Sequence, residues 1–143
     1  MTNYEKVRQF MVTFGQEVKD KPKLSNLSTC RLRLALIEEE IGELQDALVN
    51  DDLVGTADAL ADILYVVYGA AAAFGIGIDE IFDEVHDSNM SKLNEDGTPI
   101  YNKIGKVMKG PNYFKPKIAT LLLKQRGLVH RCDRFEVARR GKK

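Results

Sequence analysis

The chain lacks lysine and arginine over a long internal stretch. Between Arg33 and Lys92 there is no lysine or arginine, while fourteen aspartates and glutamates occur there. Like charges packed this closely repel one another when no cation lies nearby in the sequence to neutralise them. A folded protein tolerates such a cluster if the side chains face water, or if a bound metal ion supplies the positive charge. The missing cations therefore make a site for a hard divalent cation the first hypothesis.

Cysteines and long apolar runs are also scarce. Cys30 and Cys132 are far apart in the sequence and no CxxC occurs, which argues against a disulfide framework or a zinc site and favours reduced thiols in the cytoplasm. The N-terminus is polar and has no apolar signal segment. The most apolar stretch, residues 63–78, is short and contains three glycines. It predicts a buried helix, not a membrane span.

Charge is distributed unevenly in a chain whose net charge is zero. The 143 residues are enough for one domain with its own core. Acids outnumber bases up to Leu123, whereas residues 124–143 hold eight Lys or Arg against Asp133 and Glu136. No acid occurs between Asp96 and Asp133. An acidic middle followed by a basic end suits a metal–polyphosphate ligand.

Apolar periodicity predicts four helices, over residues 3–18, 28–50, 53–74 and 79–93. Ser28 or Thr29 is expected to cap the second helix. The second and third helices each carry an apolar stripe that we expect to face other helices. The stripe of the second helix is Leu34, Ile37, Ile41, Leu44 and Leu48, and that of the third is Ala57, Leu60, Ala61, Leu64, Val67 and Ala71.

The remainder of the chain predicts little regular structure. A short hairpin is expected at residues 96–101, a loop up to residue 117, and a short helix over 118–125. The sequence thus predicts an all-α fold, a four-helix bundle with a short irregular or hairpin C-terminal segment. Its domain spans residues 1–125, and residues 126–143 form a basic mobile tail.

Carboxylates are spaced to converge between the second and third helices. Glu40 and Asp62 each lie 11 residues from Asp51, which is in the turn joining these helices. Antiparallel pairing would bring up to five carboxylates to one spot, and an all-oxygen ligand set suits Mg²⁺ or Mn²⁺. The five are Glu39, Glu40, Glu43, Asp58 and Asp62. A solvated helix face is the ordinary alternative, but Asp62 lies in an apolar stretch and no lysine follows these acids at helical spacing.

These residues resemble a known superfamily. Residues 39–43, Glu-Glu-Ile-Gly-Glu, match the Glu-Glu-x-x-Glu motif of the all-α nucleoside triphosphate pyrophosphohydrolases, the MazG-like and phosphoribosyl-ATP pyrophosphohydrolase-like superfamily. Asp62 fits the end of the second motif, Glu-x-x-Asp, but Ala59 stands where its glutamate is expected and Asp58 precedes it. Residues 86–116 also resemble one subgroup of this superfamily. The resemblance spans roughly residues 7–118.

The resemblance implies that the protein hydrolyses a nucleoside triphosphate to the monophosphate and pyrophosphate, with Mg²⁺ required and Mn²⁺ as a substitute. The five carboxylates would hold the metal, and Glu39 could instead orient or deprotonate the attacking water. Lys92, Lys106 and Lys109 are candidates for binding phosphate, with Lys92 also a catalytic candidate. Asn89 and Gln16 are candidates for contacting base or sugar. Phe10 and Phe14 are expected in the core, although they could stack on a base.

Several alternatives stay open at the level of sequence. A phosphoribosyl-ATP pyrophosphohydrolase would act on the same kind of linkage, and a noncatalytic helical interaction module is compatible with Ala59. The wide apolar helix faces predict a homodimer or a higher homo-oligomer, and no membrane partner is expected. The basic tail carries no known nucleic-acid-binding motif, so no specific nucleic acid is expected. Base preference depends on a few side chains that one sequence does not rank.

Overall fold

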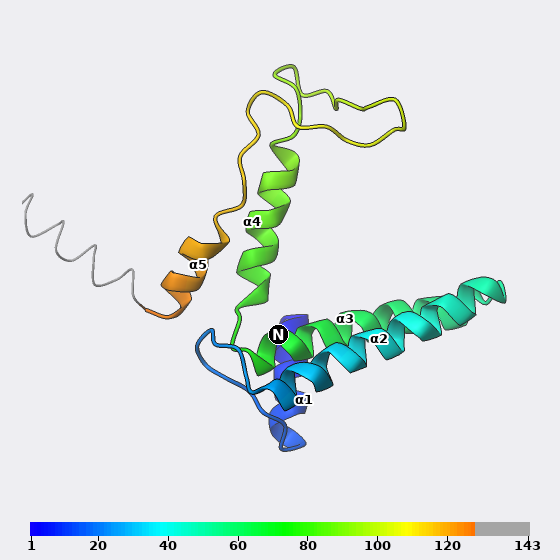
Figure 1. Ribbon diagram of the computed structural model, residues 1–143, viewed down its shortest axis with the longest axis vertical. Coiled ribbons are helices and arrows are strands. Elements are labelled where there is room, and N and C mark those ends of the chain that lie inside the picture. The colour runs from blue at the N-terminus through cyan, green and yellow to red at the C-terminus, as the bar shows by residue number, and fades with distance from the viewer. Residues whose placement is uncertain (128–143) are drawn as a thin grey trace, which may run out of the picture. The chain divides into compact units, whose positions relative to one another are not determined.

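The protein is described by a computed structural model over residues 1–127, which contain five α-helices and no β-strand (Figure 1). The all-α class is therefore confirmed. The expected tail lies almost wholly outside the described residues. The helices are α1 (Asn3–Thr13), α2 (Leu27–Val49), α3 (Leu53–Ala73), α4 (Ile78–Met90) and α5 (Ile118–Gln125).

The chain divides into two compact units, Met1–Ile78 and a second that begins at Asp79. In the first unit α2 and α3 lie side by side and α1 packs against α3 (Figure 1). α2 and α3 must run in opposite directions because only Asn50, Asp51 and Asp52 join them. Asp51 takes a left-handed conformation with φ 52°, and the Asp52 side chain accepts a 2.9 Å hydrogen bond from the Gly55 amide to cap α3.

The tight turn fixes the register of α2 against α3. A Cβ placed on Gly55 would lie 3.3 Å from the Cβ of Ala47, and one placed on Gly69 would lie 3.2 Å from Nη1 of Arg33. Ala47 and Gly55 each lie 4 residues from Asp51 in the sequence. Arg33 and Gly69 each lie 18 residues from it. Glu40 and Asp62, at 11 residues, fall midway. Opposed positions thus recur every seven residues, or two helical turns, as in an antiparallel helix pair.

The core of the first unit is built from small residues at the end of α3. Val7 and Met11 of α1 are buried against Ala72 and Ala73, and Tyr4, Val18, Tyr68 and Phe74 pack around them. Residues 69–73 are therefore largely buried, as expected from the apolar stretch. α3 is the one helix among the described residues that is long and apolar enough to cross a membrane, by length and composition only. It also carries Asp58 and Asp62.

The predicted inward stripes are wrong for this chain taken alone. Leu60, Leu64 and Val67 of α3 are exposed, as are Leu34, Ile41 and Leu48 of α2. The helices meet instead through smaller residues such as Ala47 and Ala59. Small side chains let the two backbones approach closely, so the heptad-spaced larger residues stay on the outside of the hairpin.

Helix ends differ from the expectation in three places. α1 ends at Thr13 and not at residue 18, because Gly15 adopts φ 69° and breaks the helical path. α2 begins at Leu27, where the Asn26 side chain caps it by accepting from the Thr29 amide, so the cap is neither Ser28 nor Thr29. α4 ends at Met90, three residues before the expected end.

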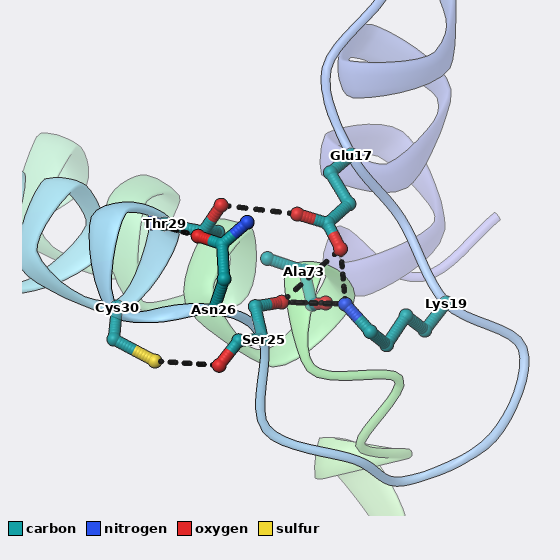
Figure 2. A network of polar contacts seen from close by, with 7 residues as sticks. All are labelled: Glu17, Lys19, Ser25, Asn26, Thr29, Cys30 and Ala73. Carbon is teal, nitrogen blue, oxygen red and sulfur yellow. Dashed lines mark hydrogen bonds and ion pairs between the residues drawn. The ribbon is translucent and has the colours of Figure 1, made fainter.

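A polar network ties the loop between α1 and α2 to the end of α3 (Figure 2). Lys19 Nζ and Ser25 Oγ both donate to the carbonyl oxygen of Ala73, at 3.2 and 3.3 Å, and Lys19 also pairs with Glu17. The Lys19 and Lys23 amides donate to the carbonyls of Ala72 and Phe74. Carbonyls at the end of a helix lack partners within the helix, so this loop satisfies them from outside.

The second unit joins α4 to the segments that follow it. Ser88 Oγ is buried and donates to the Phe114 carbonyl at 2.8 Å, and Glu84 accepts from the Lys117 amide at 2.8 Å. Lys124 of α5, the expected short helix, pairs with Glu80 at 3.0 Å. The expected hairpin is reduced to a turn at 94–98 and an isolated antiparallel bridge between Tyr101 and Val107.

Two glycines with nearly equal φ allow a controlled test of the loop packing. Gly75 (φ 65°) has no room for a side chain, because its Cβ would lie 2.3 Å from the Lys21 carbonyl oxygen, whereas Gly15 (φ 69°) has nothing within 4 Å. Gly15→Ala should cost only the left-handed strain of about 1–2 kcal/mol. Gly75→Ala should cost about 1–3 kcal/mol more from overpacking. Urea unfolding measures both, and equal losses would contradict the described loop.

Candidate metal site

Three carboxylates meet between α2 and α3. One oxygen each from Glu40, Glu43 and Asp62 can be chosen so that all lie within 4.8 Å of one another. Glu40 and Glu43 are neighbours on one face of α2, and the hairpin register places Asp62 opposite Glu40. The convergence expected from the sequence is therefore confirmed for these three residues.

Glu40 is the least favourably placed of the acids. Its Oε2 is buried and has no hydrogen-bond partner. Desolvation raises the pKa of Glu40 above its ordinary value, and the charges of Glu43 and Asp62 raise it further. Glu39 and Asp58 add smaller repulsions in the same direction. The other four predicted acids therefore all repel negative charge at Glu40.

Glu39 and Asp58 are exposed and lie outside the group of three. Ala59, where the superfamily motif has a glutamate, is 2% exposed. Asp58 is one helical turn from Asp62 on α3, and its charge is felt at Glu40. Asp58 is thus a candidate for an outer ligand, which remains a prediction, as does the role of Glu39.

The residues present fit a divalent cation. The donor set is entirely carboxylate oxygen, which suits Mg²⁺ or Mn²⁺. No ion pair within residues 1–127 involves any of the five acids. A buried carboxylate oxygen without a partner is costly unless something supplies a positive charge or a donor. A cation at this place would relieve both the unpaired oxygen and the mutual repulsion.

A cavity of about 310 Å³ opens beside the carboxylates and contains side chains from all three helices of the first unit. Gln16, which the sequence predicted as a substrate contact, lines this cavity, and its contact with a substrate stays a prediction. Its Oε1 accepts a 3.2 Å hydrogen bond from Nη2 of Arg33. The other lining residues are Val7, Phe10, Met11, Arg33, Leu36, Glu40, Asp62, Tyr65, Val66 and Gly69.

Sequence reasoning missed Arg33, which is 6% exposed and is the only buried cation among the described residues. Burial lowers the pKa of Arg33, and the charge of Glu17 opposes this. The available signal was its position, since Arg33 is the last cation before the cation-free stretch and lies two turns before Glu40. Phe10 and Phe14 are exposed and in ring contact, so their expected place in the core is wrong.

The remaining predicted residues belong to the second unit. Lys92 Nζ donates to Asn89 Oδ1 at 2.7 Å, so these two lie together at the end of α4. Lys109 stacks over the ring of Tyr113 at 4.5 Å. The Lys106 side chain is exposed, and its amide donates to the Asn102 side chain. The predicted roles of Asn89, Lys92, Lys106 and Lys109 in binding substrate stay predictions.

A protein family, a viral protein and a bacterial crystal structure are similar to this chain. A family model described as Phosphoribosyl-ATP pyrophosphohydrolase matches residues 7–89. A protein of Acanthamoeba polyphaga mimivirus, named Uncharacterized protein L479, is 39% identical over 106 residues, and the match covers 71% of this chain but 40% of that protein. The chain thus spans about two fifths of its length. The crystal structure of a proposed NTP pyrophosphohydrolase from Exiguobacterium sp. 255-15 aligns with 95% of this chain and 98% of its own, at 24% identity and a TM-score of 0.46.

The raised pKa of Glu40 predicts how stability depends on pH without metal. A carboxyl whose folded pKa is raised stabilises the fold below its unfolded pKa, near 4.5, and that contribution is lost as pH rises through the folded pKa. Glu40→Gln removes the charge and should therefore raise Tm above wild type by a margin that grows with pH through this window.

Thermal unfolding in EDTA at pH 4 to 8 measures this margin. Glu38→Gln is the matched control, because Glu38 is an exposed neighbour that does not contribute to the raised pKa of Glu40. A margin for Glu40→Gln that is independent of pH, or equal to that of Glu38→Gln, would contradict the electrostatic account of the site.

Proposed function

The chain belongs to the phosphoribosyl-ATP pyrophosphohydrolase family, and we propose that it is a Mg²⁺-dependent nucleoside triphosphate pyrophosphohydrolase. The family indicates pyrophosphohydrolase activity in general. The proposed reaction converts a (d)NTP and water into a (d)NMP and pyrophosphate, as housekeeping of the cytoplasmic nucleotide pool. The observation that supports it best is the meeting of Glu40, Glu43 and Asp62, with one buried Glu40 oxygen left unpartnered.

Each acid has a proposed part in this reaction. Glu40, Glu43 and Asp62 hold the cation, with Asp58 and Glu39 at its edge. A bound Mg²⁺ supplies charge neutralisation for the phosphates and lowers the pKa of a coordinated water. Glu39 is exposed and has no ion pair within residues 1–127, and its proposed part is to orient or deprotonate water. Mn²⁺ should substitute, since it accepts the same oxygen ligands.

Basic residues of the second unit are proposed to meet the phosphates. Lys92, Lys106 and Lys109 come from the acid-free part of the chain, and ammonium groups stabilise negative charge on a leaving pyrophosphate. Lys92 donates to Asn89 at 2.7 Å, so its ammonium group lies near the end of α4. Asn89 itself could contact base or sugar once the lysine turns to a phosphate.

Phosphoribosyl-ATP is the second candidate substrate. The description of the matching family model favours it, and the bond broken would be of the same α–β type. A chain with that activity should complement a strain that lacks this step of histidine synthesis. Failure to complement, with turnover of ordinary NTPs, would separate the two substrates.

The reaction is tested by measuring pyrophosphate and monophosphate release. The panel contains canonical and modified NTPs and dNTPs and phosphoribosyl-ATP, each with Mg²⁺, Mn²⁺ or EDTA. We expect metal-dependent turnover that falls at least about 100-fold in Glu43→Gln and Asp62→Asn, since each removes a charged ligand. Glu38→Gln should retain activity. Absence of turnover and of metal binding would favour a noncatalytic helical interaction module, which the alanine at position 59 keeps possible.

We also propose that the active form is a homodimer. Each helix of the hairpin has an exposed apolar row at heptad spacing: Leu34, Ile41 and Leu48 on α2, and Leu53, Leu60, Leu64 and Val67 on α3. Such rows are typical of faces that pair with other helices. Within residues 1–127 only eight apolar side chains are buried, and Met11 is the one large side chain that is fully buried. Two hairpins joined through these rows would form a four-helix arrangement and enlarge this sparse core.

Light scattering after gel filtration tests the dimer. The measured molar mass of wild type should be twice the chain mass of 16.1 kDa. Leu64→Glu should shift it toward the monomer, because a carboxylate would be buried at the interface. Val12→Glu, at an α1 position that is likewise 56% exposed, is the matched control and should stay dimeric. A monomeric wild type, or recovery only with detergent or lipid, would contradict the proposal.

A further inference from the structure

The cavity beside the carboxylates has two chemically different ends. One end holds Glu40 and Asp62, which face each other across the hairpin. The other end holds Arg33, which lies against Gly69. Arg33 and Glu40 are seven residues apart on α2, or about 10 Å along the helix. That separation is comparable to the reach of a nucleoside from its 5′-phosphate to the far edge of its base.

The Arg33 end is rich in hydrogen-bond donors. A guanidinium has five N–H donors and no acceptor. Nη2 donates to Gln16, but Nε has no hydrogen-bond partner, although Arg33 is only 6% exposed. Leaving a buried charged donor unpaired is costly, and a ligand acceptor would remove that cost. Gly69 makes this placement possible, since a Cβ there would lie only 3.2 Å from Nη1.

Gln16 adds a second donor at the same end. Because Arg33 only donates, the carboxamide of Gln16 must present its oxygen to the guanidinium. Its NH₂ group therefore points away from the guanidinium, and Gln16 is one of the residues that line the cavity. Both polar side chains at this end therefore carry N–H donors, and the Gln16 oxygen already accepts from Arg33.

The rest of the cavity lining is mostly apolar. The rings of Phe10 and Tyr65 meet edge to face with centroids 5.7 Å apart, and the other apolar side chains of the lining are Val7, Met11, Leu36 and Val66. A phosphate would lose its hydration against such a wall without compensation, whereas a planar base gains by packing on it. The size of about 310 Å³ falls within the usual range of small-molecule pockets.

We propose that this cavity is the nucleobase pocket of the enzyme and that Arg33 and Gln16 select bases whose outer edge carries a carbonyl oxygen. The inference rests on the proposed function, which places the phosphates at the carboxylate end. Uracil, thymine, guanine and hypoxanthine present such an oxygen. Cytosine and adenine present an amino group at the equivalent position, and its N–H would face the N–H groups of Arg33 and Gln16.

A purely structural Arg33 is the competing account. In that case a buried water would accept from Nε, and the guanidinium would serve only to join α1, α2 and α3. The two accounts differ in one measurable respect. A structural arginine contributes to stability without affecting the choice of base, whereas a base-reading arginine affects the choice of base.

The experiment compares nucleotide pairs that differ by one oxygen or amino group. Calorimetry measures Kd for dIMP against dAMP and for dUMP against dCMP, which does not require turnover. Pyrophosphate release gives kcat/KM for the corresponding triphosphates with Mg²⁺. We expect wild type to favour the oxo member of each pair by about tenfold or more, in both Kd and kcat/KM, since a site of donors rejects a donor edge.

Variants assign the selectivity to the donors. Arg33→Met keeps an unbranched side chain but removes the five guanidinium donors and the hydrogen bond that orients Gln16, and should bring both ratios to within about twofold of one. Arg31→Met, at an exposed position on the same helix, is the matched control and should keep the wild-type ratios. Gly69→Ala crowds the guanidinium without changing its chemistry and should lower the ratios, which keeps the test possible if Arg33→Met does not fold.

The outcomes separate the pocket from the reaction. Equal Kd values for both members of each pair in wild type would overturn the pocket, even if every triphosphate is hydrolysed. Selectivity that persists in folded Arg33→Met would also overturn it and leave Arg33 as a structural residue. Selective binding of monophosphates without any pyrophosphate release would support the pocket and count against the proposed function alone.

Discussion

The register of α2 against α3 is the constraint on which the rest of the first unit depends. A three-residue turn joins the helices, and opposed positions then recur at seven-residue intervals on both sides of Asp51. The first opposed pair is Ala47 and Gly55. The second is Glu40 and Asp62, and the third is Arg33 and Gly69. Small residues at the first and third contacts let the backbones approach, so the acids between them are held close together.

This arrangement concentrates negative charge that forms no ion pair within residues 1–127. Negative side chains gather in the middle of the hairpin, and the pKa of Glu40 is raised by burial and by its neighbours. A positive guanidinium is buried two turns away on the same helix. The repulsion stored in the middle favours a cation there, and the unpaired donor farther along favours an acceptor. One cavity therefore has complementary requirements at its two ends, which a metal-bound nucleotide would satisfy together.

Sequence reasoning was reliable where it depended on local spacing. Helical periodicity placed the four longer helices, and equal distances from Asp51 predicted that Glu40 and Asp62 would meet. It was unreliable where packing partners decide the outcome. The heptad rows of Leu34 and Leu64 were expected inside and are exposed, because alanines and glycines form the contact within the chain. The cap of α2 also moved to Asn26, since several polar residues in a row could each have served.

The sequence by itself determined the helices, the turn between α2 and α3, and the acidic motif, because these follow from residue spacing along one or two neighbouring helices. Only the tertiary structure decided that Arg33 is buried, that Gln16 and Phe10 of the first segment cover the same cavity, and that Ala59 points into the packed region. Those facts depend on how α1 and the loop after it return to the end of α3. Contacts between segments distant in sequence leave no periodic signal in the sequence. Such contacts bring Gln16 and Arg33 together at the cavity.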